Sequence, residues 1–251
     1  MNIKKYFVNF IKKFDIRVEK ISSNPKFEQL LVSALKANNV DLVLDCGANR
    51  GQFADILIKN SYEKKLISFE PLSLAHNELL TRSKKNSNWK IYERCALGNF
   101  NGSSYINISN YEQSSSMLYM RQFHLDAKPN SFYKGKEAVK VLKLDSIYNE
   151  ISEGSKKIFL KIDTQGYEKE ILDGAKNSLD KLSGIMVEVS LVELYANDNN
   201  HNKSINGGFS NNWIDLILQI QKEGFNLWLL ERGFSDPNTS RTLQMDLVFF
   251  R

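Results

Sequence analysis

Short apolar runs, separated by amphipathic stretches, dominate the pattern of hydrophobic and polar positions along this chain. The runs are continuous rather than alternating, which indicates strands buried on both faces of a parallel sheet. The stretches between them carry apolar residues at helical spacing, such as Phe53, Ile56 and Leu57. A helix that starts at Tyr167 is expected to continue through 175–183, and the Asn-rich residues 196–212 are expected to form a polar loop. The runs predict seven strands, at residues 42–45, 65–70, 89–95, 157–163, 185–189, 225–230 and 244–250.

The last two predicted strands differ from the others, because a loop with Asp236, Pro237 and Asn238 joins them and no helix lies between. Strands connected without a crossover helix pair antiparallel. We therefore predict an α/β fold with a doubly wound, mostly parallel, seven-stranded, Rossmann-like sheet and an antiparallel last strand.

Two segments depart from this alternation of strands and helices. Residues 99–140 read as an insertion with two alternating strands and a loop from His124 to Gly135, and we expect it to cover the site. Residues 1–38 read as a helical extension of a domain at 39–251. Within the extension, residues 1–20 form a basic amphipathic pattern, typical of a helix that either docks on the domain or contacts a membrane surface.

The first strand ends in a turn with the spacing G-x-x-x-G, from Gly47 to Gly51, and a helix follows. A dinucleotide turn has three glycines and cradles a pyrophosphate. Here Asp45 stands at the turn, and a carboxylate repels a pyrophosphate but attracts an ammonium group. Glu70 ends the second strand, close to the roughly 20-residue spacing of an acid that holds ribose hydroxyls. This charge pattern favours S-adenosylmethionine over NAD.

The cofactor contacts expected from this unit lie in the turn, after the second strand and at the end of the third, where the adenine pocket of such folds usually lies. They are Asp45, Gly47, Ala48, Asn49, Gly51, Gln52, Glu70, Pro71, Ala96 and Leu97.

Composition narrows the class of protein. Hydrophobic residues make up 42% and charged residues 25%, as in ordinary globular chains. No apolar run approaches the ~18 residues of a membrane span, and the N-terminus lacks the pattern of a secretory signal. We expect a cytoplasmic protein, peripheral at the inner membrane surface if residues 1–20 bind lipid. Cys46 and Cys95 are expected to be reduced, buried thiols, too few for a metal site.

The net charge of +5 permits an anionic partner but does not demand nucleic acid. No nucleic-acid-binding motif is present, so we expect no nucleic acid as partner. The acceptor is expected to be a small molecule or a glycan.

With these segments placed, the chain resembles the FkbM-type S-adenosylmethionine-dependent methyltransferases over roughly residues 40–250. The most specific piece matches the family's K-I-D-x-x-G-x-E signature, from Lys161 to Glu168. Two departures show: Arg50 stands where many relatives have a small residue, and Gln165 where Glu is common. The other matching residues are Asp45, Gly47, Ala48, Asn49, Gly51, Gln52, Phe69, Glu70, Pro71, Ala96, Leu97, Gly98, Ser114, Ser115, Ser116, Met117, Leu144, Asp145, Val187 and Glu188.

The resemblance implies a class I methyltransferase fold and O-methylation, commonly of hydroxyls on sugars or natural products. Residues 14–18 also resemble the leader of relatives associated with surface-glycan synthesis, which favours a glycan acceptor. Two alternatives stay open: an NAD-dependent sugar oxidoreductase or epimerase, and a non-catalytic Rossmann-like binding module.

Methyl transfer to a hydroxyl needs a base or a metal, because a sugar hydroxyl is a poor acid. Asp163 and Glu188 are expected at the carboxyl ends of neighbouring strands, where they could act as base or bind Mg²⁺. Lys161 points to the same face as Asp163 and is expected to pair with it. Alternatively, Asp163 caps a helix and Glu188 pairs with Lys161.

The insertion supplies the remaining candidates. His124 is a candidate base, with a surface histidine as the alternative. Ser115 and Ser116 are candidates for hydrogen bonds to the cofactor or acceptor, unless they belong to a loop with no specific role.

Overall fold

The structure is a computed structural model that describes residues 25–197 and 213–251. The predicted amphipathic helix at 1–20 and most of the polar loop at 196–212 lie outside the described residues. No helix in the described part of the chain is long and apolar enough to cross a membrane.

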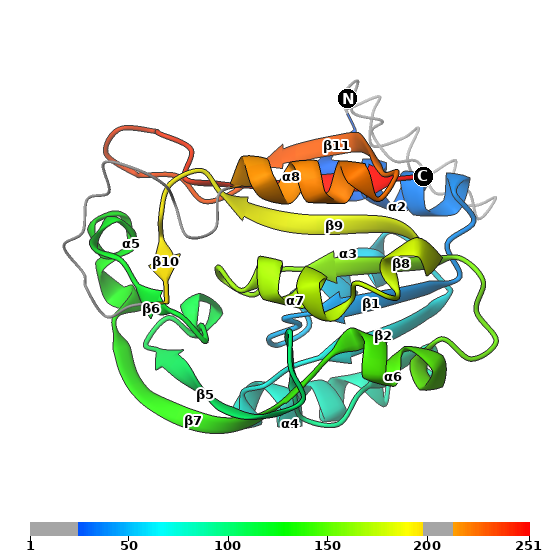
Figure 1. The fold of residues 1–251 in the computed structure, drawn as a ribbon, viewed down its shortest axis with the longest axis horizontal. Coiled ribbons are helices and arrows are strands. Elements are labelled where there is room, and N and C mark those ends of the chain that lie inside the picture. Colours follow the sequence, from blue (N-terminus) through cyan, green and yellow to red (C-terminus); the bar gives the residue numbers. More distant parts are fainter. Residues whose placement is uncertain (1–24, 198–212) are drawn as a thin grey trace, which may run out of the picture.

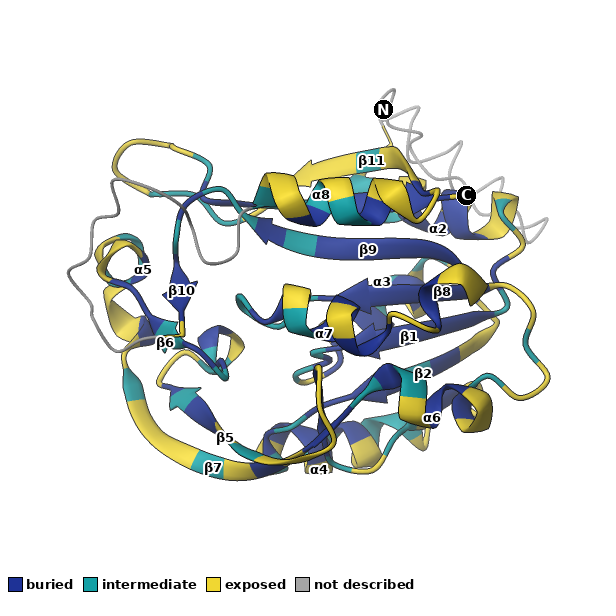
Figure 2. Cartoon of the chain, in the orientation of Figure 1, coloured by how far each residue is buried: buried dark blue, intermediate teal, exposed yellow. Residues whose placement is uncertain are grey.

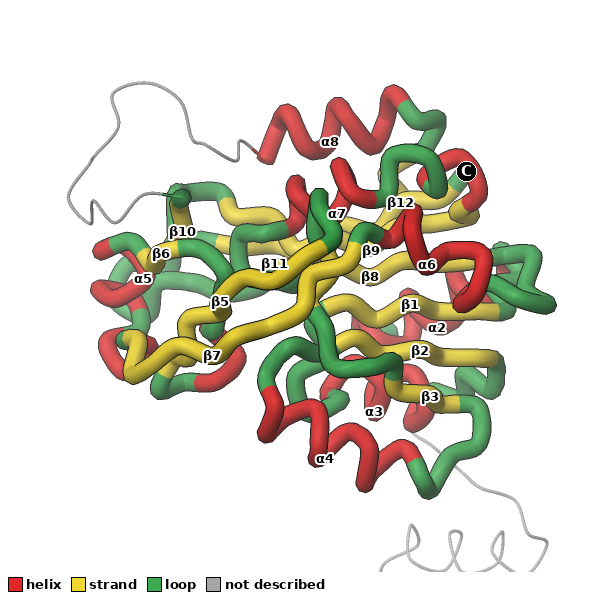
Figure 3. Tube along the Cα trace, turned by 60° about the horizontal axis from the view of Figure 1, so that its bottom comes forward, coloured by secondary structure: helices red, strands yellow, loops and turns green. Residues whose placement is uncertain are grey.

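A seven-stranded sheet forms the centre of the molecule, in the order β11-β12-β9-β8-β1-β2-β3 (Figures 1 and 3). The five strands from β9 to β3 pair parallel, and β12 pairs antiparallel with both β9 and β11. This confirms the predicted Rossmann-like sheet and its antiparallel last strand. The strands are β1 (Leu42–Cys46), β2 (Lys65–Phe69), β3 (Trp89–Ile91), β8 (Ile158–Ile162), β9 (Leu182–Ser190), β11 (Asn226–Arg232) and β12 (Gln244–Phe250).

Helices cover both faces of this sheet, and β1 and β8 are buried at every residue, as their continuous apolar runs require (Figure 2). One face packs on α2 (Phe27–Ala37), α3 (Gln52–Lys59) and α4 (Ser73–Ser83). The other packs on α6 (Leu144–Ile151), α7 (Glu168–Gly174) and α8 (Trp213–Lys222).

The insertion forms a separate small layer at the carboxyl ends of the central strands (Figure 1). Its main part is a long antiparallel pair, and a two-stranded sheet joins it to the segment after β9. Its elements, with the two short strands that pair with it, are β4 (Ala96–Leu97), β5 (Gly102–Ser109), η1 (Glu112–Ser114), β6 (Tyr119–Met120), α5 (Gln122–Ala127), η2 (Pro129–Ser131), β7 (Tyr133–Leu142) and β10 (Tyr195–Ala196).

Three sequence-based predictions of secondary structure are wrong. The third strand ends at Ile91 instead of Cys95, because Ala96 and Leu97 leave the main sheet and pair with β7. The expected loop around His124 contains the helix α5. The helix predicted to continue through 175–183 ends at Gly174, and only the 3-10 turn η3 (Leu179–Lys181) follows.

Candidate active site

The glycine turn after β1 has the backbone that its sequence predicts. Gly47 and Gly51 have φ angles of 76° and 87°, and Asn49 also lies in the left-handed region at 46°. The backbone N–H of Asn49 donates to the Glu70 carboxylate at 2.7 Å, and that of Leu72 donates to its other oxygen at 2.8 Å. Glu70 therefore joins the ends of β1 and β2 at the position expected of the ribose-binding acid.

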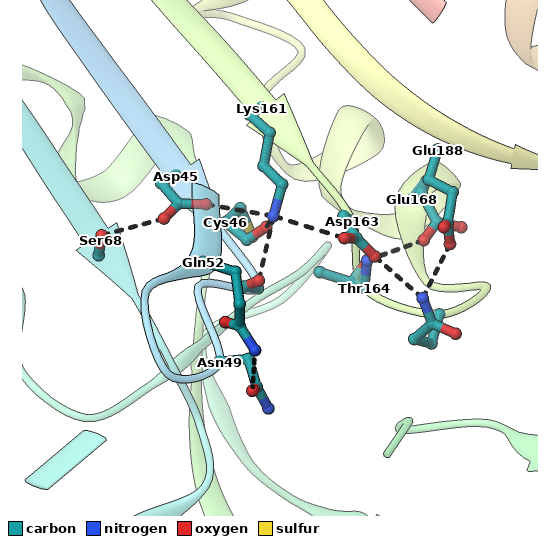
Figure 4. Close-up of polar contacts among 12 residues, drawn as sticks. Asp45, Cys46, Asn49, Gln52, Ser68, Lys161, Asp163, Thr164, Glu168 and Glu188 are labelled. Atoms are coloured by element: carbon teal, nitrogen blue, oxygen red, sulfur yellow. Dashed lines mark hydrogen bonds and ion pairs between the residues drawn. The ribbon is translucent and has the colours of Figure 1, made fainter. Parts of the chain in front are cut away.

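Asp45 does not face a ligand, which corrects the role predicted for it. Its side chain is fully buried and lies across the sheet from its register partners Ser68 and Lys161. Lys161 Nζ lies 3.1 Å from Asp45 Oδ1, and Ser68 Oγ donates to Oδ2 at 3.1 Å (Figure 4). The carboxylate thus neutralises a buried lysine instead of receiving the ammonium group of a cofactor.

Lys161 connects the buried Asp45 to the cavity. Its Nζ also donates to the carbonyl oxygen of Gly47 at 3.1 Å and lies 3.6 Å from Asp163 Oδ2 (Figure 4). Burial lowers the pKa of Lys161, but Asp45 and Asp163 more than offset it, so the pKa lies above its ordinary value and the lysine is charged. The predicted pairing of Lys161 with Asp163 is confirmed.

A cavity of about 830 Å³ opens at the carboxyl ends of β1, β2, β8 and β9, between the glycine turn and the insertion. Three predicted site residues do not line it: Asp45, Gly51 and Ser116. Gly51 instead packs on Trp89, and Ser116 Oγ donates to the carbonyl oxygen of Gln165 at 2.7 Å. The predicted residues that line the cavity are Gly47, Ala48, Asn49, Gln52, Glu70, Pro71, Ala96, Leu97, Ser115, His124, Lys161, Asp163 and Glu188.

The insertion covers the cavity, as predicted, and Arg50 binds the insertion through Glu112. Arg50 donates from Nε and Nη2 to the two carboxylate oxygens of Glu112, at 2.9 and 3.0 Å, and also pairs with Glu78. The residue that departs from the family pattern in the first turn thus connects that turn to η1 and to α4.

His124 is 2% exposed, so it is not the surface histidine that was the alternative. Its Nε2 lies 3.2 Å from Ser114 Oγ, and its ring packs against Tyr195 and Phe234. Its Nδ1 has no hydrogen-bond partner among the described residues. Burial, and then the charge of Lys128, lowers its pKa to about 4, so His124 is neutral at pH 7.

Asp163 and Glu188 come together at the cavity, and the amide nitrogen of Gln165 lies between them. It donates to Asp163 Oδ1 at 2.9 Å and to Glu188 Oε2 at 2.8 Å. Gln244 Nε2 donates to the same Glu188 oxygen at 2.6 Å. The alternatives, a helix cap by Asp163 and an ion pair of Glu188 with Lys161, are wrong. Asp163 accepts from the Gln165 amide, and Glu188 accepts from the amides of Gln165 and Gln244.

The predicted Mg²⁺ site at Asp163 and Glu188 is not supported. Among the described residues, no group of three or more acidic, histidine or cysteine side chains is placed to hold a metal ion. The space between the two carboxylates is occupied by the hydrogen-bond donor of Gln165.

The cavity is lined by an acidic residue that the sequence analysis did not predict, Asp246. Burial, and then the nearby Asp163, raises the pKa of Asp246 to about 7. Burial also raises the pKa of Glu188 well above its usual range, with Asp163 and Asp246 as further causes. Sequence reasoning missed Gln244 and Asp246, although the alternation along β12 places both on one face, opposite Ser190 and Glu188.

Comparison with known proteins identifies the family. The model of the FkbM methyltransferase domain matches residues 45–227, which is most of the chain. This chain belongs to the FkbM methyltransferase family. It is therefore a methyltransferase, and its cofactor is S-adenosylmethionine. No curated protein sequence matches this FkbM methyltransferase.

Solved structures resemble the FkbM methyltransferase described here only distantly. An rRNA methylase from Streptococcus thermophilus is 11% identical, with 93% of this chain and 99% of that one covered and a TM-score of 0.44. The methyltransferase domain of bacterial CtHen1-C is 11% identical, with 89% and 95% covered and a TM-score of 0.45. A protein of the NADB-Rossmann superfamily from Streptococcus agalactiae is 10% identical, with 93% and 71% covered and a TM-score of 0.45.

The residues of this FkbM methyltransferase fit its cofactor. Glu70 has an unshared lone pair on each oxygen for a ribose hydroxyl, and Phe69, Leu72, Leu97 and Met117 give an apolar wall for a base. The side chain of Asp163 is 38% exposed and lines the cavity beside the Gly47 turn, whereas that of Asp45 is fully buried. When bound, S-adenosylmethionine supplies an electrophilic methyl group on a sulfonium.

Proposed function

We propose that this enzyme transfers a methyl group to a hydroxyl oxygen of a sugar in a surface glycan or glycoconjugate. The observation that carries the proposal is the pair of carboxylates, Asp163 and Glu188, that lines the cavity beside the glycine turn. A sugar hydroxyl must lose its proton during transfer, and a positioned carboxylate can accept it. The glycan part of the proposal is supported by the family resemblance and by the leader-like residues 14–18.

Asp163 is the proposed base. Its carboxylate is partly exposed to the cavity, while Glu188 receives two amide hydrogen bonds on one oxygen. The proton of the acceptor hydroxyl passes to Asp163 as the carbon–oxygen bond forms and the carbon–sulfur bond breaks, which leaves a methyl ether and S-adenosylhomocysteine. Lys161 Nζ lies 3.6 Å from Asp163 Oδ2, so a positive charge lies beside the proposed base.

His124 is proposed to orient the acceptor. It is neutral and buried, and its Nδ1 lacks a protein partner among the described residues while its ring lines the cavity. A buried ring nitrogen without a partner is costly, so a hydroxyl that bonds to it gains affinity. Ser114 and the two aromatic neighbours fix the plane of the ring.

The test is to incubate the full chain with labelled S-adenosylmethionine and a panel of glycans, with and without a chelator, and to locate the methyl group by NMR. We expect label on a sugar oxygen. Asp163→Asn should lower kcat by about 10²–10⁴ and leave the affinity for S-adenosylhomocysteine near that of the wild type. Asp173→Asn, in an exposed carboxylate of α7, is the matched control and should change neither quantity.

Two outcomes would contradict this proposal. One is methylation of an RNA included in the panel, with no glycan labelled. The other is full turnover by Asp163→Asn.

We also propose that residues 1–20 hold the enzyme at the inner membrane surface. The support is their basic amphipathic pattern, together with the fact that Pro25, Lys26 and Phe27, where the described chain starts, line the cavity. Sedimentation with vesicles of anionic lipid should capture the wild-type chain. Charge reversal at four lysines should release it: Lys4, Lys5, Lys12 and Lys13. Reversal of Lys84 and Lys85 is the control, and equal capture of all three proteins would refute the proposal.

A further inference from the structure

Gln165 joins two strands of the site through one nitrogen atom. Its Nε2 donates one hydrogen to Asp163, which follows β8, and the other to Glu188 in β9, at 2.9 and 2.8 Å. A side-chain amide has two donor hydrogens, and both are used here. The two accepting oxygens therefore lie within two hydrogen-bond lengths of each other, with the amide between them.

The hydrogen-bond network settles which way the amide points. Gln165 Oε1 accepts a hydrogen bond from the hydroxyl of Tyr195 at 2.8 Å. If the oxygen and nitrogen were exchanged, the amide oxygen would face two carboxylates and the hydrogen bonds to both would be lost. Tyr195 is itself buried, and burial raises its pKa well above the usual range, so it is present as a donor.

The backbone of Gln165 is held as firmly as its side chain. Its φ of 58° lies in the left-handed region, which a residue other than glycine adopts only where its surroundings require it. Gly166 follows at 97°, and a Cβ there would lie 2.7 Å from Tyr195 Cβ. Ser116 of the insertion donates to the Gln165 carbonyl oxygen at 2.7 Å. The segment with Tyr195 and the insertion thus both hold the backbone at this residue.

We propose that Gln165 is a positioning residue of the methyl transfer, whose amide takes the place that a divalent cation would hold between Asp163 and Glu188. Two free carboxylates this close repel each other and would turn apart. A cation between them would hold them but withdraw charge from both. The neutral amide holds the two side chains together without withdrawing charge from Asp163, so Asp163 keeps its ability to accept a proton. The catalytic part of this inference rests on the proposed function, whereas the structural part does not.

The decisive variant is Gln165→Glu, which removes both donor hydrogens and places a third carboxylate beside the pair. Three carboxylates with water are suitable ligands for Mn²⁺ or Mg²⁺. We expect this variant to bind a single Mn²⁺ at least about tenfold more tightly than the wild type, measured by electron paramagnetic resonance without any acceptor. Its metal-free activity should fall by about 10-fold or more and recover in part with added Mn²⁺.

Gln165→Met separates positioning from simple packing. Methionine fills similar space without a donor, so its kcat should fall about as far as that of Gln165→Glu, and Mn²⁺ should not restore it. The affinity for S-adenosylhomocysteine should change little in either variant. Gln219→Glu is the matched control, since Gln219 on α8 also donates to a carboxylate, that of Asp173, but does not line the cavity, and it should gain no Mn²⁺ binding.

Two results would overturn the inference: Gln165→Glu that binds Mn²⁺ no better than the wild type, or Gln165→Met with wild-type kcat. Failure of the proposed function looks different. In that case no glycan is methylated by any protein in the series, but the gain in Mn²⁺ binding by Gln165→Glu persists, because that measurement involves no acceptor.

Discussion

Gly47 and Asp163 approach so closely that a Cβ on Gly47 would lie 1.9 Å from the Asp163 carbonyl oxygen. The backbone N–H of Asp163 donates to the carbonyl oxygen of Cys46 at 3.2 Å, so the glycine turn and the proposed base share one backbone junction. Gly47 also has a positive φ of 76°. A side chain at this position is excluded both by its contacts and by its backbone.

Gly47→Ala should therefore disrupt both parts of the site. We expect a loss of about 2 kcal/mol or more in the free energy of unfolding, from overpacking and backbone strain together. Binding of S-adenosylhomocysteine, measured by calorimetry, should fall at least tenfold. Gly135→Ala is the control, because a Cβ there meets nothing within 4 Å, and it should behave as the wild type. Near-normal binding by Gly47→Ala would contradict the junction described above.

Glu70 should be required as a carboxylate and not only as a hydrogen-bond acceptor. Its two oxygens accept from the backbone N–H groups of Asn49 and Leu72, and the amide of Glu70→Gln would turn a donor toward one of them. We expect Glu70→Gln to weaken cofactor binding by about 10-fold or more. Glu63→Gln, in an exposed residue, is the control. Equal affinities of the two variants would show that Glu70 does not shape the turn.

The contact between Arg50 and Glu112 should matter for holding the cofactor more than for stability. Both side chains are partly exposed, so the pair is worth at most about 1 kcal/mol. Arg50→Ala frees η1 from the glycine turn, and we expect a faster release of S-adenosylhomocysteine, by a few-fold, in stopped-flow measurements at low salt. The release rate of the wild type should approach that of the variant as the salt concentration is raised, because salt screens the Arg50–Glu112 pair. Lys169→Ala removes an exposed ion pair in α7 and should not alter release.

Glu168 should make stability depend on pH. Burial raises its pKa to about 7, although its Oε1 accepts from the backbone N–H groups of Thr164 and Gly166, both at 3.0 Å. A folded-state pKa above the unfolded one means a contribution that is fully present below about pH 4.5 and lost as pH rises through about 7.

Glu168→Gln keeps the accepting oxygen and cannot ionise. Urea denaturation at several pH values should show that its stability falls less than that of the wild type between about pH 4.5 and 7. The difference should grow toward the upper end of that range, to roughly 3 kcal/mol. Parallel pH dependences of the two proteins would rule out ionisation of Glu168 as the cause.

Much of the fold follows from local pattern. Continuous apolar runs predict β1 and β8 because both faces of these strands are covered, and the missing helix before β12 predicts its antiparallel pairing. The secondary structure of the insertion is harder to predict from sequence. Its strands are recognisable from alternation, but α5 has too few residues for a periodic signal, and its helical state is set by packing against neighbouring segments.

The site residues also divide into those that the sequence pattern predicts and those that depend on tertiary contacts. Glu70 could be placed from spacing, because the ends of neighbouring parallel strands meet. Asp45 could not, since its role depends on the register that sets Lys161 opposite it in β8. Sequence alone showed Gln165 as a lost carboxylate. Its amide bonds to the nearby Asp163 and also to Glu188 and Tyr195, which come from two other segments, and no local pattern encodes these two distant contacts.

One side of the cavity is formed by a single stretch of chain, between β4 and α6. The opposite side is formed by the ends of strands that are distributed along the rest of the sequence. A stretch of this kind can be exchanged as a cassette. Grafting the corresponding stretch of a relative onto this sheet should carry over the donor's choice of acceptor and leave the methyl-donor half intact. We therefore expect the choice of acceptor to depend on this one stretch, and the stability of the enzyme to depend on the seven-stranded sheet.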